Sequence, residues 1–422
     1  MKYFAKAFVI FLFIFIASCG NKEDLEPSLS DDLGYDVEYT EETILIEDAS
    51  AILALDSVSQ TYTFDATKFQ KEPANGEIIL VAGEAMRKVN SVQKSGDKYI
   101  IQTQDAALTD VIKNGTIAWE ITPEWENVSS VRMGGKKVGS PEGISANGIE
   151  FSISNGGIDH KVRIEPTLTE GKISSCNFKM QMVKKVGGSA TVAFTAEGTA
   201  KLPKQKTKIT IKDGKLETFI ANNEGISSEI TLSLSAAGGK SGEHSLKMPG
   251  VALSIPIRFI PTPSGPIPMP IPMSIDIGIQ FVSQLHIPDI QSSATAESKL
   301  SLSADAGFEY KGTTVETSAK IEKDEITDGT FDSAANLGQP IDVQFGIAFP
   351  RVGLNIAGQE VAYVHTGFTT GSSLYWGPLC KSGYVKLLVE GGYGLKVLGQ
   401  TIAEDKKVFA ESQKVAKSEN CQ

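Results

Sequence analysis

Polar and apolar residues alternate along most of this chain, a pattern typical of antiparallel β-sheet with one buried face. The longest example runs from Ala294 to Tyr310. At ~3.3 Å per residue, one strand of this length spans about 55 Å, whereas strands usually span ~17–20 Å. Asp213-Gly214 and Lys311-Gly312-Thr313 predict turns between such strands. We therefore expect residues 141–422 to form a large, elongated antiparallel β domain.

The preceding part of the chain predicts a small β-rich domain over residues 43–132. Asn75-Gly76 and Ser95-Gly96-Asp97 are turn sequences between short strand patterns. One short helix is predicted, with Asp105 as its N-cap and Gly115 at its C-terminal stop. The predicted strands cover residues 43–46, 61–64, 77–81, 88–92, 98–103 and 116–122. Glycines and lysines from residue 133 to residue 143 then interrupt the pattern, so the predicted fold class is mainly β with two domains.

A proline-rich segment, residues 249–288, interrupts the alternation. Prolines at every second position from 266 to 272 remove backbone donors from one edge of an extended chain, which favours a protected edge strand. The apolar residues between and before the prolines also fit a groove for an acyl chain or another apolar ligand. An extended segment that binds a partner is a third alternative. The candidate ligand-binding residues here are Ile257, Phe259, Met269 and Met273.

The N-terminus has the layout of an export signal. Lys2 and Lys6 precede an apolar run that is too short to span a membrane, and Ile16-Ala17-Ser18-Cys19 follows it. This stretch resembles the lipobox of bacterial lipoproteins, with Ile and Ser in place of the commoner Leu and Gly or Ala. The resemblance implies that residues 1–18 are removed as a signal peptide and that Cys19 carries fatty acids such as palmitate. The alternative is an ordinary secretory signal with an incidental Cys19.

The residues that follow Cys19 indicate a location. Lys22-Glu23-Asp24 resembles the surface-export signal of Bacteroidota-type lipoproteins, which implies an outer-membrane protein exposed at the cell surface. The alternative is a charged linker. Residues 21–48 hold eleven acids and one lysine, out of a net charge of −11 for the whole chain. We therefore expect residues 19–42 to be an acidic tether that repels itself and extends.

The charge distribution and the cysteines indicate which kinds of ligand and cross-link this protein can have. No basic stripe is present, which argues against nucleic-acid binding. Cys176 lies in an alternating stretch and is expected in a core. Cys380 and Cys421 are predicted to form a disulfide in the oxidising cell envelope, closing a loop of about 40 residues, and the alternative is two free thiols. No cysteine or histidine spacing resembles a zinc site, and we expect no metal or other cofactor.

Candidate chemistry is sparse. The four histidines are scattered and none has the sequence neighbours of a known catalytic site. Trp119 and Trp125, with acids between them, form a sugar-stacking platform if they are exposed, although aromatic residues near strands are more often core residues. We therefore expect no enzyme activity and no catalytic residues.

Three hypotheses about function follow. The first is a surface-exposed outer-membrane lipoprotein that acts as a non-enzymatic binding or structural module. The second is an elongated β carrier of lipid or another apolar ligand. The third is a glycan hydrolase. The expected partners are the membrane, through the N-terminal lipid, and a surface protein, glycan or lipid ligand.

Overall fold

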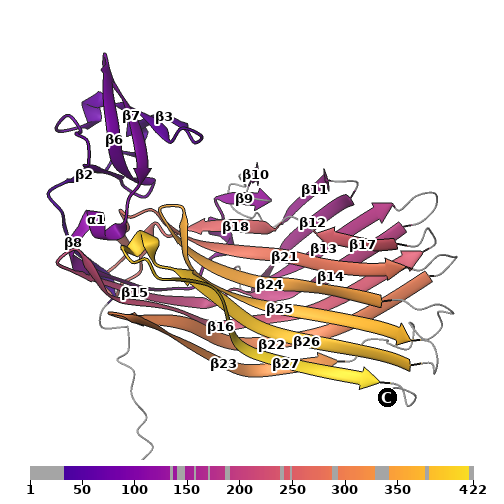
Figure 1. Ribbon diagram of the computed structural model, residues 1–422. Coiled ribbons are helices and arrows are strands. Elements are labelled where there is room, and N and C mark those ends of the chain that lie inside the picture. Colours follow the sequence, from indigo (N-terminus) through magenta and orange to yellow (C-terminus); the bar gives the residue numbers. More distant parts are fainter. Residues whose placement is uncertain are drawn as a thin grey trace, which may run out of the picture.

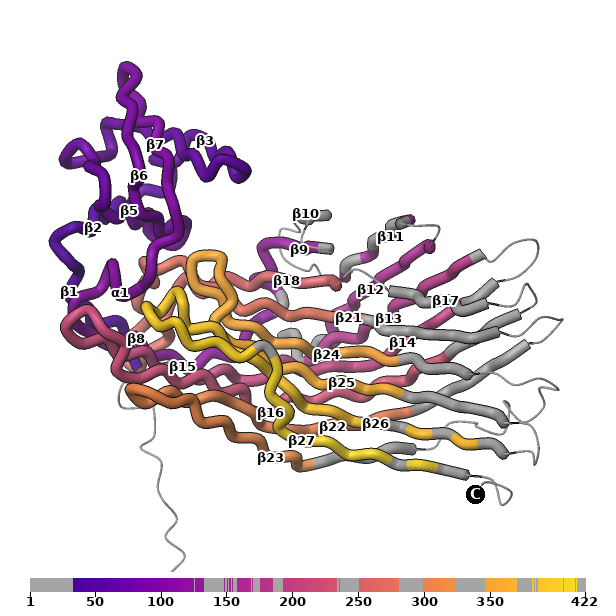
Figure 2. The backbone as a smooth tube through the Cα atoms, viewed as in Figure 1, coloured from indigo at the N-terminus to yellow at the C-terminus, as the bar shows by residue number. Residues whose placement is uncertain are grey.

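The part of the chain that the structure describes is mainly β, with two large sheets, one smaller sheet, a two-stranded hairpin and one short α-helix (Figure 1). The computed structural model describes residues 33–133, 136–139, 148–155, 158–169, 172–185, 191–237, 242–247, 250–287, 293–327, 342–375 and 380–417. The predicted fold class is confirmed. The long strands of the two large sheets run in similar directions, and the small sheet stands at one end of them (Figures 1 and 2).

The small sheet has the strand order β2-β5-β6-β7-β4-β3. Its strands are β2 (Thr43–Ile46), β3 (Ile52–Asp56), β4 (Thr61–Asp65), β5 (Ile78–Val81), β6 (Ala85–Ser95) and β7 (Lys98–Asp105). Only β2 and β5 pair in parallel among these strands. The predicted turn at Ser95-Gly96-Asp97 joins β6 to β7. Tyr62, Phe64 and Phe69 stack in the sheet's own core, with ring centroids 5.5 Å apart for each neighbouring pair.

The first large sheet has the path β1-β8-β15-β16-β14-β13-β12-β11, and β22 and β23 extend it from β16. Its bounds are β1 (Gly34–Tyr39), β8 (Ile112–Ile121), β11 (Ile149–Asn155), β12 (Ile158–Thr169), β13 (Lys172–Lys185), β14 (Thr191–Lys201), β15 (Lys204–Lys212), β16 (Lys215–Ala237), β22 (Ser293–Lys311) and β23 (Thr314–Thr327). The predicted strand at 294–310 is therefore confirmed as β22. The predicted turn at Asp213-Gly214 joins β15 to β16, with positive φ at both residues as a type I′ hairpin requires.

The second large sheet has the path β10-β9-β18-β21-β24-β25-β26-β27, with β17 also paired to β21. Its bounds are β9 (Ser130–Met133), β10 (Lys136–Gly139), β17 (Gly242–Lys247), β18 (Val251–Pro256), β21 (Met273–Ile287), β24 (Asp342–Ile356), β25 (Gln359–Tyr375), β26 (Cys380–Gly394) and β27 (Ala403–Lys417). A separate pair, β19 (Phe259–Ile260) and β20 (Ile267–Pro268), forms a short hairpin within the proline-rich segment. Edge strands β23 and β27 of the two large sheets lie side by side (Figures 1 and 2).

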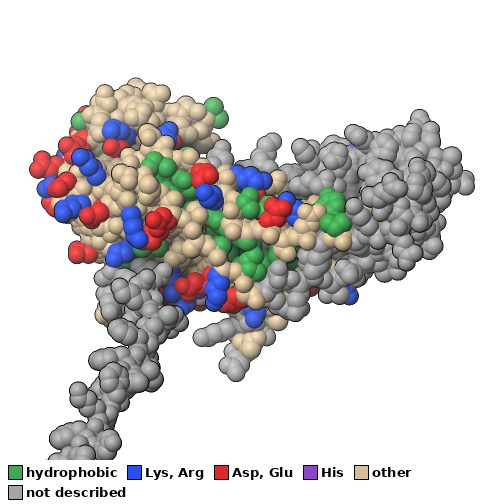
Figure 3. Space-filling model, turned by 60° about the horizontal axis from the view of Figure 1, so that its bottom comes forward, with side chains coloured by type: hydrophobic (Ala, Val, Ile, Leu, Met, Phe, Trp, Pro, Cys, Tyr) green, Lys and Arg blue, Asp and Glu red, His purple; other side chains and the backbone are tan. Residues whose placement is uncertain are grey.

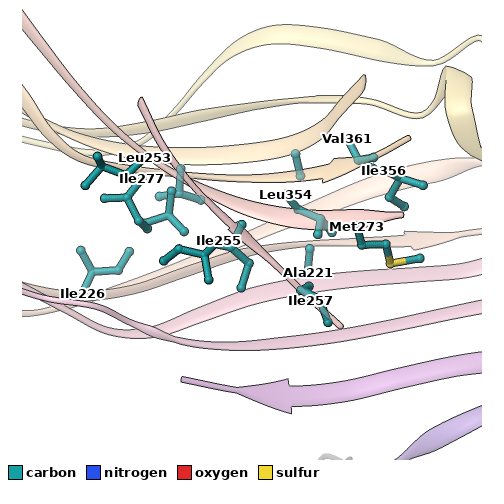
Figure 4. Close-up of a cluster of buried hydrophobic side chains, with 14 of the residues drawn as sticks. Ala221, Ile226, Leu253, Ile255, Ile257, Met273, Ile277, Leu354, Ile356 and Val361 are labelled. Atoms are coloured by element: carbon teal, nitrogen blue, oxygen red, sulfur yellow. The ribbon is translucent and has the colours of Figure 1, made fainter. Parts of the chain in front are cut away.

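One core joins the two large sheets. Its members include Cys176, which is 1% exposed as its pattern predicts. Phe178 of β13 packs against Phe349 of β24 with ring centroids 4.4 Å apart. Figure 4 shows Ala221 and Ile226 of β16 near Ile255 and other aliphatic residues of the second sheet. Burial of these inward faces, at about 25 cal/mol per Å² of apolar surface, is the main force that holds the sheets together.

The helix is shorter than predicted. α1 covers Leu108–Val111, and its N-cap is Ala107, whose backbone N–H donates to the Asp110 carboxylate at 3.0 Å. Asp105 ends strand β7 instead, and Gly115 lies inside β8. Gly115 has a φ of +147°, and a Cβ atom there would meet the Asp36 carbonyl oxygen of β1 at 2.3 Å. The absence of a side chain at Gly115 therefore allows β1 and β8 to pair closely, and Gly115 does not end a helix. Short 3₁₀-helices cover Ala49–Ala51, Ala66–Lys68, Trp125–Asn127 and Lys396–Leu398.

The tether expected over residues 19–42 is wrong for its last part. Residues 34–39 form β1, because Tyr35, Val37 and Tyr39 alternate with polar residues and pack against the core of the large sheets. Strands β8 and β9 also pair with the large sheets, through β15 and β18. The small sheet therefore ends at Asp105, earlier than the predicted domain end at residue 132. The division of 43–132 and 141–422 into separate domains stays a prediction.

Candidate functional site: the junction pocket

A pocket of about 890 Å³ lies between the connection from β8 to β9 and the end of β18. We call it the junction pocket. Its lining consists of residues 120–124, 126–129, 255–259, 261 and 275. A volume of this size is within the ~300–1,000 Å³ range of small-molecule sites. The pocket brings together two segments that are more than a hundred residues apart in the chain.

The floor of the junction pocket is aliphatic. Ile255 and Ile257 are 4% and 5% exposed, and Ile275 of β21 is fully buried. Ile257 continues the spacing of β18, since its backbone N–H donates to the Met273 carbonyl at 2.9 Å. Ile255 and Ile257 also lie in the cluster between the large sheets (Figure 4). The floor is therefore part of a packed core and is rigid before any ligand arrives.

The opposite wall is fixed to β18 by hydrogen bonds. The Ser129 backbone N–H and its hydroxyl both donate to the Ser254 carbonyl, at 2.9 Å and 3.2 Å. Upstream, the Asn127 N–H donates to the Glu124 carbonyl at 3.0 Å and closes the 3₁₀ turn at 125–127. The Asn127 side-chain amide also donates to the Glu124 carboxylate at 3.2 Å. This wall therefore has a defined position relative to the floor.

An exposed aromatic residue stands on the rim. Phe259 is 54% exposed, whereas the adjacent Ile260 is fully buried. The β19–β20 hairpin sets this alternation, because Phe259 pairs with Pro268 and Ile260 pairs with Ile267. A further bond from the Met269 N–H to the Arg258 carbonyl, at 2.9 Å, continues the hairpin. The hairpin thus holds an aromatic ring at the edge of the aliphatic floor.

Charges of both signs surround the floor. The carboxylate of Glu120 lies between Lys204 and Lys206, and its hydrogen bond with Lys204 lowers the pKa of Glu120. Glu124 and Glu126 are exposed on one wall, and Arg258 is exposed on the other. Figure 3 shows the same mixture on a larger scale, with basic and acidic side chains interspersed beside a run of apolar ones.

The predicted ligand-binding residues divide into two groups. Ile257 and Phe259 line the junction pocket. Met269 and Met273 are 3% and 4% exposed, so they fill the core rather than the wall of a groove. The groove stays a prediction, and of its four residues only Ile257 and Phe259 line this pocket.

The predicted sugar-stacking platform is wrong for Trp119. Its ring is fully buried and its Nε1–H donates to the Gln205 carboxamide oxygen at 3.3 Å. Trp125 begins the 3₁₀ turn on the pocket wall, but its side chain lies outside the described residues. Cys19 and Cys421 lie outside them too, so the lipidation and the Cys380–Cys421 disulfide stay predictions.

A second polar cluster lies across strands β24 to β27. His365 Nε2 is 2.9 Å from one Glu390 carboxylate oxygen, and Lys406 Nζ is 2.9 Å from the other. Burial lowers the pKa of His365, against the opposing effect of Glu390. The Arg351 guanidinium lies 4.0 Å from the Tyr363 ring centroid and binds Glu360, with 2.6 Å between Nη2 and Oε2. Opposite charges lie next to one another across neighbouring strands, so we interpret these groups as a cross-strand network that orders the sheet.

Sequence reasoning missed this network and one wall of the pocket. His365 and Glu390 are directly opposed in the β25–β26 ladder, but 25 positions separate them in the chain. The wall at 120–129 carried one signal, the Trp119 to Trp125 stretch, which was interpreted as a platform and not as a wall.

No family model, curated protein or solved structure matches this chain. Within the described ranges, no group of three or more His, Cys, Asp and Glu side chains is placed to hold a metal ion. The described helices include none with the length and apolar character needed to cross a membrane.

Proposed function

We propose that this protein is a surface-exposed outer-membrane lipoprotein that acts as a non-enzymatic binding module, with the junction pocket as its binding element. The observation that carries the proposal is the pocket itself, a volume of about 890 Å³ with an aliphatic floor and charged walls. The lipobox-like stretch that ends at Cys19 supports the anchor, and Lys22-Glu23-Asp24 supports the surface location.

Binding in this pocket needs little rearrangement. Ile255, Ile257 and Ile275 already pack on the core, and Ser129 already holds the wall against β18. Each methylene that a ligand buries against such a floor contributes about 0.8 kcal/mol. A preformed site keeps most of this free energy, because few side chains lose freedom on binding.

Two measurements test the proposal separately. For the anchor, cells that express the wild type or Cys19→Ser are labelled with palmitate and treated with protease while intact. We expect label and surface cleavage only for the wild type. Equal palmitate incorporation by Cys19→Ser would refute the anchor.

For the binding element, the protein purified from cells is analysed by native mass spectrometry. We expect a bound small molecule on the wild type, and a reduced amount on Phe259→Asp, which changes an exposed rim residue. The same occupancy on both proteins, or an empty wild type, would refute the junction pocket as the site.

A second candidate is the elongated β carrier, which would hold an apolar ligand between the large sheets. The observation that favours it is the length of β16 and β22, which cover 23 and 19 residues. The packing of Phe178 against Phe349 and of Phe308 against Tyr393 shows that the described interior near these rings is filled. A bound molecule that cross-links to β16 or β22 instead of residues 255–261 would favour the carrier.

A further inference from the structure

The junction pocket has features that specify the class of its ligand, beyond the fact of binding. The apolar part of the ligand is set by the floor, where three isoleucine side chains and the Phe259 ring offer branched aliphatic and aromatic surface. A flexible aliphatic chain follows such a surface without needing polar partners. The volume of about 890 Å³ is within the range of small-molecule sites.

The polar part of the ligand is set by the walls. Glu120 is already compensated by Lys204 and Lys206. Glu124 and Glu126, which are exposed, line the pocket from one segment, and the exposed Arg258 lines it from the other. A purely anionic head group would be repelled by the acids, and a purely cationic one by Arg258. A head group with both charges is attracted by both walls.

The position of the tether places the pocket near a membrane. β1 runs antiparallel to β8 with Gly34 opposite Ala118, and the pocket lining begins two residues further along, at Glu120. The chain therefore enters the fold beside the pocket. At ~3.3–3.6 Å per residue, the segment from Cys19 to Gly34 spans at most about 50 Å. A lipid on Cys19 would keep the pocket within that distance of the bilayer surface.

We propose that the junction pocket binds a single-chain zwitterionic amphiphile drawn from the membrane, a lipid of the lysophospholipid type with an ammonium and a phosphate in its head. This inference rests on the proposed function of the pocket. The aliphatic chain lies over Ile255 and Ile257 and against Phe259. The ammonium faces Glu124 and Glu126, and the phosphate faces Arg258.

The test uses the full-length lipoprotein in vesicles of phosphatidylglycerol, which supply no zwitterion. Four photoreactive probes share one diazirine-bearing chain and differ in the head: phosphoethanolamine, phosphate, ammonium and hydroxyl. Labelled peptides are identified by mass spectrometry. We expect labelling of residues 120–129 and 255–261, with half-maximal labelling by the phosphoethanolamine probe at a concentration about tenfold lower than for the other three.

Variants test which charged side chain interacts with the ammonium and which with the phosphate. Arg258→Gln should improve labelling by the ammonium probe relative to the phosphate probe, and Glu124→Gln with Glu126→Gln should do the reverse. Phe259→Ser should weaken labelling by all probes at least fivefold. Its matched control is Val415→Ser on β27, because Val415 is 55% exposed and Phe259 is 54% exposed. The control should label like the wild type.

The outcomes separate the inference from the proposed function. If all four probes label both segments equally, or if the charge variants leave the head-group order unchanged, the zwitterion is wrong and the binding pocket stands. If labelling falls outside both segments, or if Val415→Ser weakens it as much as Phe259→Ser does, the proposed function fails as well.

Discussion

Ile257 and Phe259 line the same pocket, but shortening each to alanine should have very different effects on the unfolding free energy. Ile257 is 5% exposed and continues β18 through its hydrogen bond to Met273. Ile257→Ala removes three carbon atoms, which at ~0.8 kcal/mol each costs about 2 to 3 kcal/mol of unfolding free energy. The cost stays near the low end of the usual range because the side chain borders the open pocket, so no closed cavity is left.

Phe259 is 54% exposed, so Phe259→Ala should change the unfolding free energy by about 0.5 kcal/mol or less. The same change removes the rim contact and should weaken ligand binding about tenfold, because an aromatic ring contributes ~1.5 kcal/mol or more when it is covered.

The assay is urea unfolding of both variants and the wild type, followed by circular dichroism and by tryptophan fluorescence. Trp119 is buried in β8 and reports on the large sheets. The midpoint should fall clearly for Ile257→Ala and stay near the wild-type value for Phe259→Ala. An unchanged midpoint for Ile257→Ala would refute the description of the floor as core. A large fall for Phe259→Ala would refute the description of the rim.

Three further predictions concern other parts of the fold. The His160 ring is 2% exposed, has no hydrogen-bond partner for either nitrogen among the described residues, and has a pKa lowered by burial. The unfolded state therefore binds a proton more readily, so stability should fall as pH drops below about 6.5. His160→Leu should flatten the dependence of stability on pH between pH 7 and pH 5, and should raise the unfolding free energy by ~1–3 kcal/mol. A steeper dependence on pH in thermal unfolding of the variant would contradict this prediction. Gly115→Val should detach β1, because the Cβ of the valine would meet the Asp36 carbonyl oxygen at 2.3 Å. Limited proteolysis should then cut within residues 34–39. Protection of these residues equal to that in the wild type would argue against the pairing of β1 with β8. Of Cys176, Cys380 and Cys421, a thiol reagent should modify only Cys176 in the oxidised protein under denaturing, non-reducing conditions. Reaction at Cys380 or Cys421 would refute their bridge. Cys421→Ser should cost about 4 kcal/mol of unfolding free energy in the chain-entropy model.

Alternation along the chain was enough to predict a β-rich fold and its longest strand, because the side-chain period fixes which face of a strand is buried. The long strand β22 and the hairpin turn at Asp213-Gly214 followed from it directly. The side-chain period does not indicate which strands are neighbours in a sheet. The pairing of β1 with β8, and of β8 with β15, joins residues whose sequences carry no mark of one another.

The candidate site was harder to predict for a related reason. Apolar residues at 255–259 indicated one side of a pocket, but the other side depends on a connection at 122–129 held by Ser254. Whether an aromatic residue is exposed depends on its neighbours in space. Trp119 is buried in the core of the large sheets and its Nε1–H donates to Gln205 of β15, which no local pattern reveals.

The β1–β8 ladder has a mechanical consequence for a protein held at Cys19. If Cys19 is the anchor, tension on it would reach the described fold at Gly34, where β1 begins, and would load the hydrogen bonds of the β1–β8 ladder. Tyr35 and Tyr39, whose hydroxyl oxygens are 2.8 Å apart, add side-chain contacts along the same strand. This strand would be the first to detach under tension, and its release would lengthen the tether beside the junction pocket.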